Sequence, residues 1–272
     1  MTNKIKPWIE RLSKRIPALK RHALSAAAGI MPVLLPCAAA LLLMNFLEAL
    51  GERYAWMQDA GAFWALVDSI LVLPLAAGMI TYAVSAFWEH RSFSLNDAVQ
   101  LVRIRIKPVL ITGIAAGAII LVFRWIGSAV SSIIGILPAL LGWIPVLGAV
   151  ISGVVGFVVW LLALVMEFIA HAALVCGMLA LTADGMSGRP QLERTISVIW
   201  GSRDDTLCDM GLAFGVWVVF GALGWLLGLI PGVLGALAGS IISAALYALS
   251  MTAISAVYLA ARDKQDGMHF HP

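Results

Sequence analysis

The stretch LGAVISGVVGFVVWLLALVMEFIAHAALVCGMLAL, residues 147–181, contains no Lys, Arg or Asp, and its ionisable groups besides a cysteine are Glu167 and His171. A helix needs about 20 consecutive apolar residues to cross the hydrocarbon core of a bilayer. This stretch exceeds that length, whereas a helix on the surface of a soluble protein would carry a polar face. The stretch therefore predicts a transmembrane helix.

The rest of the chain is also rich in apolar residues and poor in charged ones. Of its 272 residues, 61% are hydrophobic and 12% are charged, and the mean hydropathy is +0.96. Soluble domains hold about 25% charged residues, so lipid must solvate most of this chain. The three cysteines, Cys37, Cys176 and Cys208, lack the spacing of a disulfide framework or a zinc site. We predict an all-α, polytopic transmembrane bundle, and we expect neither a metal nor a cofactor.

Apolar runs predict about six transmembrane helices within one membrane domain, residues 23–261. Several charged residues between the first two runs predict an aqueous loop around Glu48 to Asp59. Residues 127–147 predict either a tight turn or a re-entrant segment, and a re-entrant backbone would have to be covered by protein. The expected spans are 23–47, 66–88, 108–126, 147–181, 210–230 and 233–260.

The first 22 residues are basic and amphipathic. Ile5, Trp8, Ile9, Leu12 and Ile16 recur at helical spacing, which predicts a short helix lying in the membrane interface. The alternative is a frayed basic tail. No nucleic-acid-binding signature accompanies the charge, so we expect no nucleic-acid partner. The side chains expected to contact the lipid surface are Lys4, Arg11, Lys14, Arg15, Lys20 and Arg21.

Positive charge is divided unevenly between the two sides of the membrane. With the N-terminus inside, 16 of the 18 Lys and Arg fall on the inner side, and only Arg53 and Arg124 fall on the outer side. Cytoplasmic loops carry an excess of Lys and Arg. We therefore expect a multi-pass protein of the bacterial inner (cytoplasmic) membrane with both termini in the cytoplasm, residues 262–272 forming a cytoplasmic tail.

Two short amphipathic helices are predicted on the cytoplasmic side, at 95–106 and 191–200. Ser94 and Asp97 have the spacing of a capping box, and Pro190 suits a helix start. Each helix precedes an apolar hairpin with a similar turn, LLGWIPVLGA at 140–149 and LLGLIPGVLGA at 226–236. One explanation of this similarity is a repeated unit of one short helix and one transmembrane hairpin. The alternative is that apolar turns commonly use Leu, Gly and Pro.

The polar segments between the spans carry a resemblance to a known family. RSFSLNDA at 91–98 follows the second span, the segment 184–203 with Trp200 follows the fourth, and YLAAR at 258–262 follows the sixth. From about residue 66 onward, the chain resembles bacterial six-helix proteins related to the membrane domain of glycerophosphoryl diester phosphodiesterases. The resemblance implies this architecture and a lipid-related role. It transfers no catalytic residue, because it concerns the membrane domain and not the soluble catalytic one.

Glu167 and His171 are the ionisable pair expected deep inside a span. Four residues apart on a helix, they share one face. Counted at ~1.5 Å per residue back from Asp184, His171 lies near mid-membrane and Glu167 somewhat further out. Charge is costly there, so the pair predicts either a polar lock between helices or a pathway for protons or substrate. An interfacial ion pair, an outer gate or a headgroup contact is predicted at the outer edge for Glu48, Asp68 and Arg124.

Three functions are compatible with these features. The sequence carries no common nucleotide-binding, esterase or metalloprotease motif. We expect a non-enzymatic membrane protein that handles or senses a lipid or another amphiphile, alone or as an accessory subunit of a membrane complex. The alternatives are a secondary transporter or channel that uses Glu167 and His171, and a scaffold whose cytoplasmic helices dock a soluble partner. Membrane lipids are the expected partners, and a protein partner or a homo-oligomer stays open.

Overall fold

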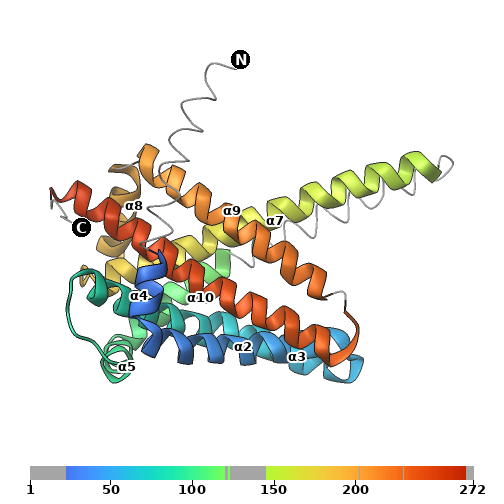
Figure 1. Ribbon diagram of the computed structural model, residues 1–272, viewed down its shortest axis with the longest axis horizontal. Coiled ribbons are helices and arrows are strands. Elements are labelled where there is room, and N and C mark those ends of the chain that lie inside the picture. Colours follow the sequence, from blue (N-terminus) through green and yellow to red (C-terminus); the bar gives the residue numbers. More distant parts are fainter. Residues whose placement is uncertain (1–22, 120–121, 123–144, 202, 229, 268–272) are drawn as a thin grey trace, which may run out of the picture.

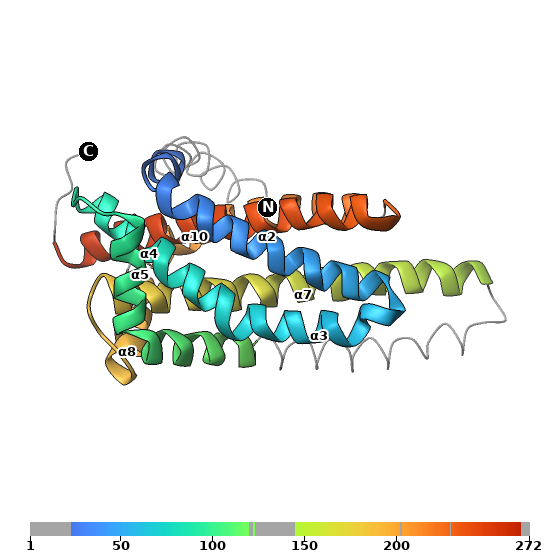
Figure 2. The same ribbon diagram turned by 90° about the horizontal axis from the view of Figure 1, so that it is seen from below.

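In the computed structural model, all regular structure in the described residues is helical, and these residues are 23–119, 122, 145–201, 203–228 and 230–267. Long helices run side by side, and two short helices, residues 95–104 and 189–201, lie at one end of them (Figures 1 and 2). The elements are α2 (Met31–Arg53), η1 (Ala55–Met57), α3 (Gln58–Val67), η2 (Asp68–Val72), α4 (Leu73–Trp88), α5 (Leu95–Ile104), α7 (Pro145–Thr182), α8 (Arg189–Gly201), α9 (Arg203–Gly228) and α10 (Gly232–Gln265).

Within these residues, five helical stretches are long and apolar enough to cross a membrane: Met31–Gly51, Ala55–Trp88, Gly156–Thr182, Asp205–Gly224 and Gly232–Gln265. A shorter apolar helix, Ile106–Ile119, follows α5. It contains the beginning of the predicted span 108–126, and most of the remainder of that span lies outside the described residues. The first 22 residues, with the predicted interfacial helix, also lie outside them.

The connection between α2 and α3 is much shorter than the predicted aqueous loop. α2 continues through Glu48 to Arg53, Tyr54 is extended, and helical structure resumes at Ala55. The charged residues therefore lie on helix ends rather than in a long loop. Two glycines permit this tight hairpin, because a Cβ on Gly51 would lie 2.3 Å from the Cα of Gly61.

A π-helical turn, η2, interrupts the helical stretch from Ala55 to Trp88. Its defining hydrogen bond joins the Leu73 N–H to the Asp68 carbonyl, five residues back. Pro74 follows immediately and accounts for the turn, because proline has no N–H and its ring clashes with the preceding turn of a regular α-helix. Helix Ile106–Ile119 packs against this feature at Gly113, where a Cβ would lie 2.1 Å from Pro74 Cγ.

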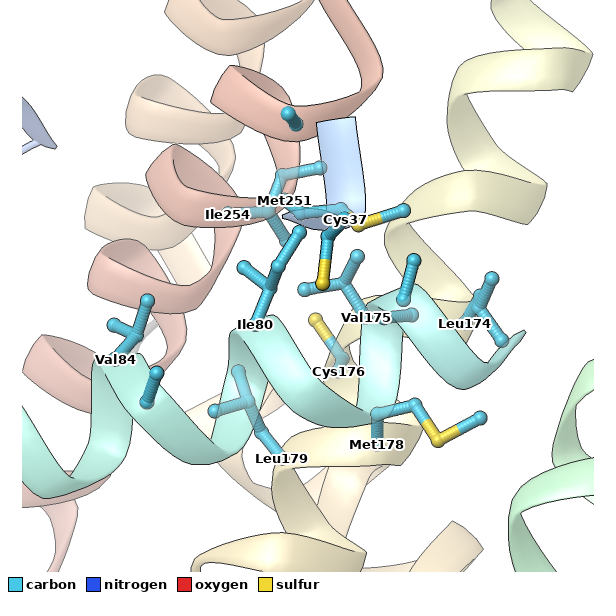
Figure 3. Close-up of a cluster of buried hydrophobic side chains, with 14 of the residues drawn as sticks. Cys37, Ile80, Val84, Leu174, Val175, Cys176, Met178, Leu179, Met251 and Ile254 are labelled. Carbon is cyan, nitrogen blue, oxygen red and sulfur yellow. The ribbon is translucent and has the colours of Figure 1, made fainter. Parts of the chain in front are cut away.

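The core lies where α2, α4, α7 and α10 meet. Figure 3 shows buried side chains of all four helices turned toward one another, among them Cys37, Ile80, Leu179 and Met251. Hydroxyl groups inside α10 do not disturb this apolar packing. Thr252 and Ser255 each donate to the carbonyl four residues earlier, at 3.0 and 2.6 Å. Such local bonds satisfy a hydroxyl without a partner from another helix.

The two short helices form where the sequence predicted helices. In α5, the Asp97 N–H donates to Ser94 Oγ and the Ser94 N–H donates to the Asp97 carboxylate, so the capping box is confirmed. α8 begins at Arg189, one residue before Pro190. Both helices lie at the end of the bundle where α4 ends and α7 ends (Figure 2).

α9 and α10 form an antiparallel hairpin, and the turn between them lies at the other end of the bundle (Figure 1). Gly232 has a φ of 76°, a conformation that glycine adopts without strain. Arg53 of α2 donates to the carbonyls of Ile230 and Gly232, at 2.7 and 2.8 Å. The α2–α3 connection and the α9–α10 turn are thus held together. The first half of the similar stretch at 140–149 lies outside the described residues, so the repeat stays a prediction.

Candidate functional site

Glu167 and His171 lie on one face of α7, as predicted, and each contacts a hydroxyl group of α10. The Tyr247 hydroxyl donates to Glu167 Oε1 at 2.6 Å. Ser250 Oγ lies 3.0 Å from His171 Nε2. Tyr247 and Ser250 are three residues apart, so they share a face of α10 just as Glu167 and His171 share a face of α7. Two polar contacts one turn apart therefore link these two helices.

The hydrogen bonds assign the tautomer of His171. Ser250 Oγ also lies 2.9 Å from the Tyr247 carbonyl, which can only accept, so the single serine proton goes there. We therefore assign the His171 Nε2–H as the donor to Ser250 Oγ. A charged ring would be costly at this buried place, so Nδ1 is assigned a lone pair. That Nδ1 is buried, and no group in the described part of the chain hydrogen-bonds to it. His171 is thus a neutral ring with one unused proton acceptor.

Aromatic rings surround the imidazole. The Trp217 ring of α9 lies 4.9 Å from that of His171, and the Tyr247 ring lies 5.4 Å from it. Trp217 and Tyr247 meet edge to face at 5.3 Å. The Phe168 ring contacts that of Trp217 edge to face, with 5.8 Å between the ring centres. The rings join α7, α9 and α10 and exclude solvent from the imidazole.

His171 and Glu167 differ in how far their side chains are exposed. His171 is 2% exposed. Glu167, one turn earlier, is only partly buried, and Ala163, one turn before Glu167 on the same face, is exposed. A carboxyl group that borders an apolar surface can exchange a proton or contact a polar group from outside the chain.

No group of three or more His, Cys, Asp or Glu side chains in the described residues could hold a metal ion.

The predicted outer-edge residues are only partly described. Asp68 begins the π-helical turn, and its Oδ1 is buried with no hydrogen-bond partner among the described residues. Glu48 lies on α2, and its carboxylate repels that of Asp68. Arg124 lies outside the described residues, so the predicted ion pair is untested, as are the lipid contacts predicted at Lys4, Arg11, Lys14, Arg15, Lys20 and Arg21. Arg53 instead caps the α9–α10 turn.

A network of ion pairs that the sequence did not predict lies at the end of the bundle with α5 and α8. Arg262 of α10 reaches three carboxylates: Glu89 and Asp184, each at 3.4 Å, and Asp263 at 3.2 Å. Asp263 also accepts from Trp88 Nε1 at 2.8 Å, and Asp184 accepts from the Tyr258 hydroxyl at 3.2 Å. The network joins α10 to the last residues of α4 and α7.

Arg194 attaches α8 to the same network. It pairs with Asp184, which follows α7, and with Asp266, which follows α10. The hydrogen bond to Asp266, and then that to Asp184, raises the pKa of the Arg194 guanidinium above its ordinary value, although burial opposes this rise. Arg194 is therefore a permanent cation between two carboxylates. α8 is fixed to the ends of two long helices.

Comparison with protein-family models, with curated proteins and with solved structures finds no match for this chain. The resemblance to the membrane domain of glycerophosphoryl diester phosphodiesterases stays a prediction. The fold and the site together define a helical protein with several apolar helices of transmembrane length and a polar junction between two of them, α7 and α10.

Proposed function

We propose that the chain is an integral protein of the bacterial cytoplasmic membrane, with six spans, an N-terminal interfacial segment and both termini inside. The charge distribution supports this placement. Contacts in the structure agree with it, since segments expected on one side meet each other. Arg53 contacts the α9–α10 turn, both expected outside. Glu89, Asp184, Arg194 and Arg262, all expected inside, form one network.

Within that membrane, the proposed function is to bind a lipid or another amphiphile, without catalysing a reaction. The observation that carries the proposal is the position of Glu167. Its carboxyl group is held by Tyr247 at 2.6 Å, yet it is only partly buried, and the apolar residue one turn earlier on the same face, Ala163, is exposed. Ionisable residues within a membrane are expensive and generally serve a function. An amphiphile suits this position, because its polar group can contact the Glu167 carboxyl group while its apolar chain lies against the apolar surface.

Replacing the carboxyl group tests this proposal. In Glu167→Gln, the side chain keeps its shape and its acceptor for Tyr247 but loses the charge, so we expect a large loss of the amphiphile that co-purifies with the wild-type chain. The measurement is native mass spectrometry after gentle extraction from the native membrane. Asp59→Asn is the matched control, because Asp59 is an exposed acid in the first turn of α3. Equal occupancy in wild type and Glu167→Gln would contradict the proposal.

The second candidate function is a transporter or channel that moves protons. The observation that favours it is the buried Nδ1 lone pair of His171, one helical turn from a carboxyl group that borders the surface. Neighbouring His and carboxyl side chains form proton relays in membrane proteins. In this function Glu167 would receive a proton and His171 would pass it on toward the interior of the bundle.

Proton flux distinguishes the two functions. In vesicles with an imposed electrical potential, a proton pathway predicts acidification by the wild type and its loss in His171→Ala. A pH-sensitive dye inside the vesicles provides the measurement. Ser250→Ala is the control, because it removes a partner of His171 and leaves both ionisable groups in place. Flux no greater than in empty vesicles would leave amphiphile binding as the function.

A further inference from the structure

The burial pattern of α8 is the reverse of that in an ordinary surface helix. Its buried residues are Gln191, Thr195 and Val198, two of them polar. Its exposed face carries Leu192, Ile196 and Trp200, whose exposed fractions are 61%, 53% and 63%. These three side chains recur every four residues and form one stripe. We call them the α8 stripe.

Contacts with three other helices hold α8 in this orientation. Gln191 Nε2 donates to the Gly177 carbonyl of α7 at 2.8 Å and to Thr112 Oγ1 of helix Ile106–Ile119 at 3.0 Å. Gln265 of α10 donates to Ser197 Oγ at 2.7 Å. Arg194 adds its ion pairs with Asp184 and Asp266. Turning the stripe inward would break all of these bonds, so the outward apolar face is a built feature of the fold.

We propose that α8 is an interfacial helix and that the α8 stripe enters the boundary between headgroups and acyl chains of the inner leaflet. The inference rests on the membrane placement proposed above. Amphipathic helices that lie in this boundary bury one apolar face and keep their cations at the headgroups. Tryptophan is enriched at the same depth. Trp200 at one end of the stripe and Arg189 at the other suit these two positions.

Three further observations favour lipid over a protein as the occupant. Arg189 lies on the same face as the stripe, since it is three residues before Leu192, and its side chain is 88% exposed. It can therefore reach an anionic headgroup. The apolar helix α9, which follows α8, also exposes apolar side chains, among them Leu207, Val216 and Val219. α5, at the same end of the bundle, also exposes apolar side chains, Val99 and Ile104, beside exposed Arg103.

The test uses the full chain in vesicles of phosphatidylcholine and phosphatidylglycerol. An environment-sensitive fluorophore is attached to Ile196→Cys, and quenching by nitroxide lipids is compared with quenching by aqueous iodide. The native cysteines in the described residues are buried, which makes the labelling selective. Ser187→Cys, in the exposed connection between α7 and α8, is the aqueous control. Val219→Cys, on the exposed face of α9, is the reference for membrane placement.

We expect nitroxide lipids to quench the fluorophore at Ile196 severalfold more than that at Ser187, and iodide to show the opposite order. If Val219 is quenched by the lipids and Ile196 only by iodide, the interfacial position of α8 is wrong while the membrane placement stands. If lipids quench neither, the membrane placement itself is wrong. A photo-crosslinker at Ile196 provides a second measurement in the native membrane. Crosslinks to lipid support the inference, and crosslinks to a protein overturn it.

Discussion

Arg262→Ala is expected to lower the free energy of unfolding by about 3 kcal/mol, because removing one partner of a buried ion pair leaves the other charges buried and unpaired. The Arg262 side chain is 8% exposed and contacts Glu89, Asp184 and Asp263. Without the guanidinium, these three carboxylates face one another at the junction of α4, α7 and α10. Thermal unfolding in detergent, followed by circular dichroism, measures the change.

Lys264→Ala is the matched control for Arg262→Ala. Lys264 lies two residues further along α10, and its pair with Asp205 is shorter, at 2.6 Å, but 64% and 43% of the two side chains are exposed. Exposed ion pairs contribute little to stability, so this variant is expected to unfold almost like the wild type. Equal effects of the two substitutions would mean that the Arg262 network does not hold the helix ends together.

Trp217→Ala is the second substitution with a large expected effect, about 3–5 kcal/mol, the range for a buried aromatic residue truncated to alanine. The Trp217 side chain is 1% exposed and contacts the rings of His171, Phe168 and Tyr247. Its loss opens a cavity where α7, α9 and α10 meet. The same thermal unfolding experiment applies, and hydrogen exchange around His171 is expected to rise.

Trp56→Ala is the control for the loss of a tryptophan as such. Trp56 lies in η1 and is 82% exposed, so its removal is expected to leave the unfolding temperature in detergent nearly unchanged. If Trp217→Ala were as mild as this control, the aromatic junction would not contribute to packing. The position of His171 would then depend on Ser250 and Tyr247.

The helices could be predicted from the sequence because each has a local signal. An uncharged apolar run predicted α7, and the spacing of Ser94 and Asp97 predicted the start of α5. The loop predicted around Glu48 to Asp59 was wrong, because the structure there depends on a contact between two helices and not on a local signal. Charged residues there predict a loop, but glycines at 51 and 61 let two helices meet closely, and the charged residues lie at the helix ends.

The candidate site could be predicted only in part. Glu167 and His171 stand out because ionisable residues are rare inside apolar runs. Their partners Tyr247 and Ser250 lie 80 and 79 residues away, and common side chains at that separation give no signal until α7 and α10 are packed. Trp217 likewise resembles any other tryptophan of an apolar helix. The Arg262 network has no signal in the sequence, because Glu89 and Asp184 are far from Arg262 along the chain and meet it only when the ends of α4, α7 and α10 pack together.

The membrane placement is the central claim, and labelling of single cysteines in intact spheroplasts tests it most directly. A membrane-impermeant maleimide is added to cells that carry Trp56→Cys, in the α2–α3 connection, or Ser187→Cys, in the α7–α8 connection. Both positions are exposed, so the membrane alone decides whether each is labelled. We predict labelling at residue 56 without lysis and at residue 187 only after permeabilisation. Equal labelling of both in intact spheroplasts, or the reverse order, would contradict the placement.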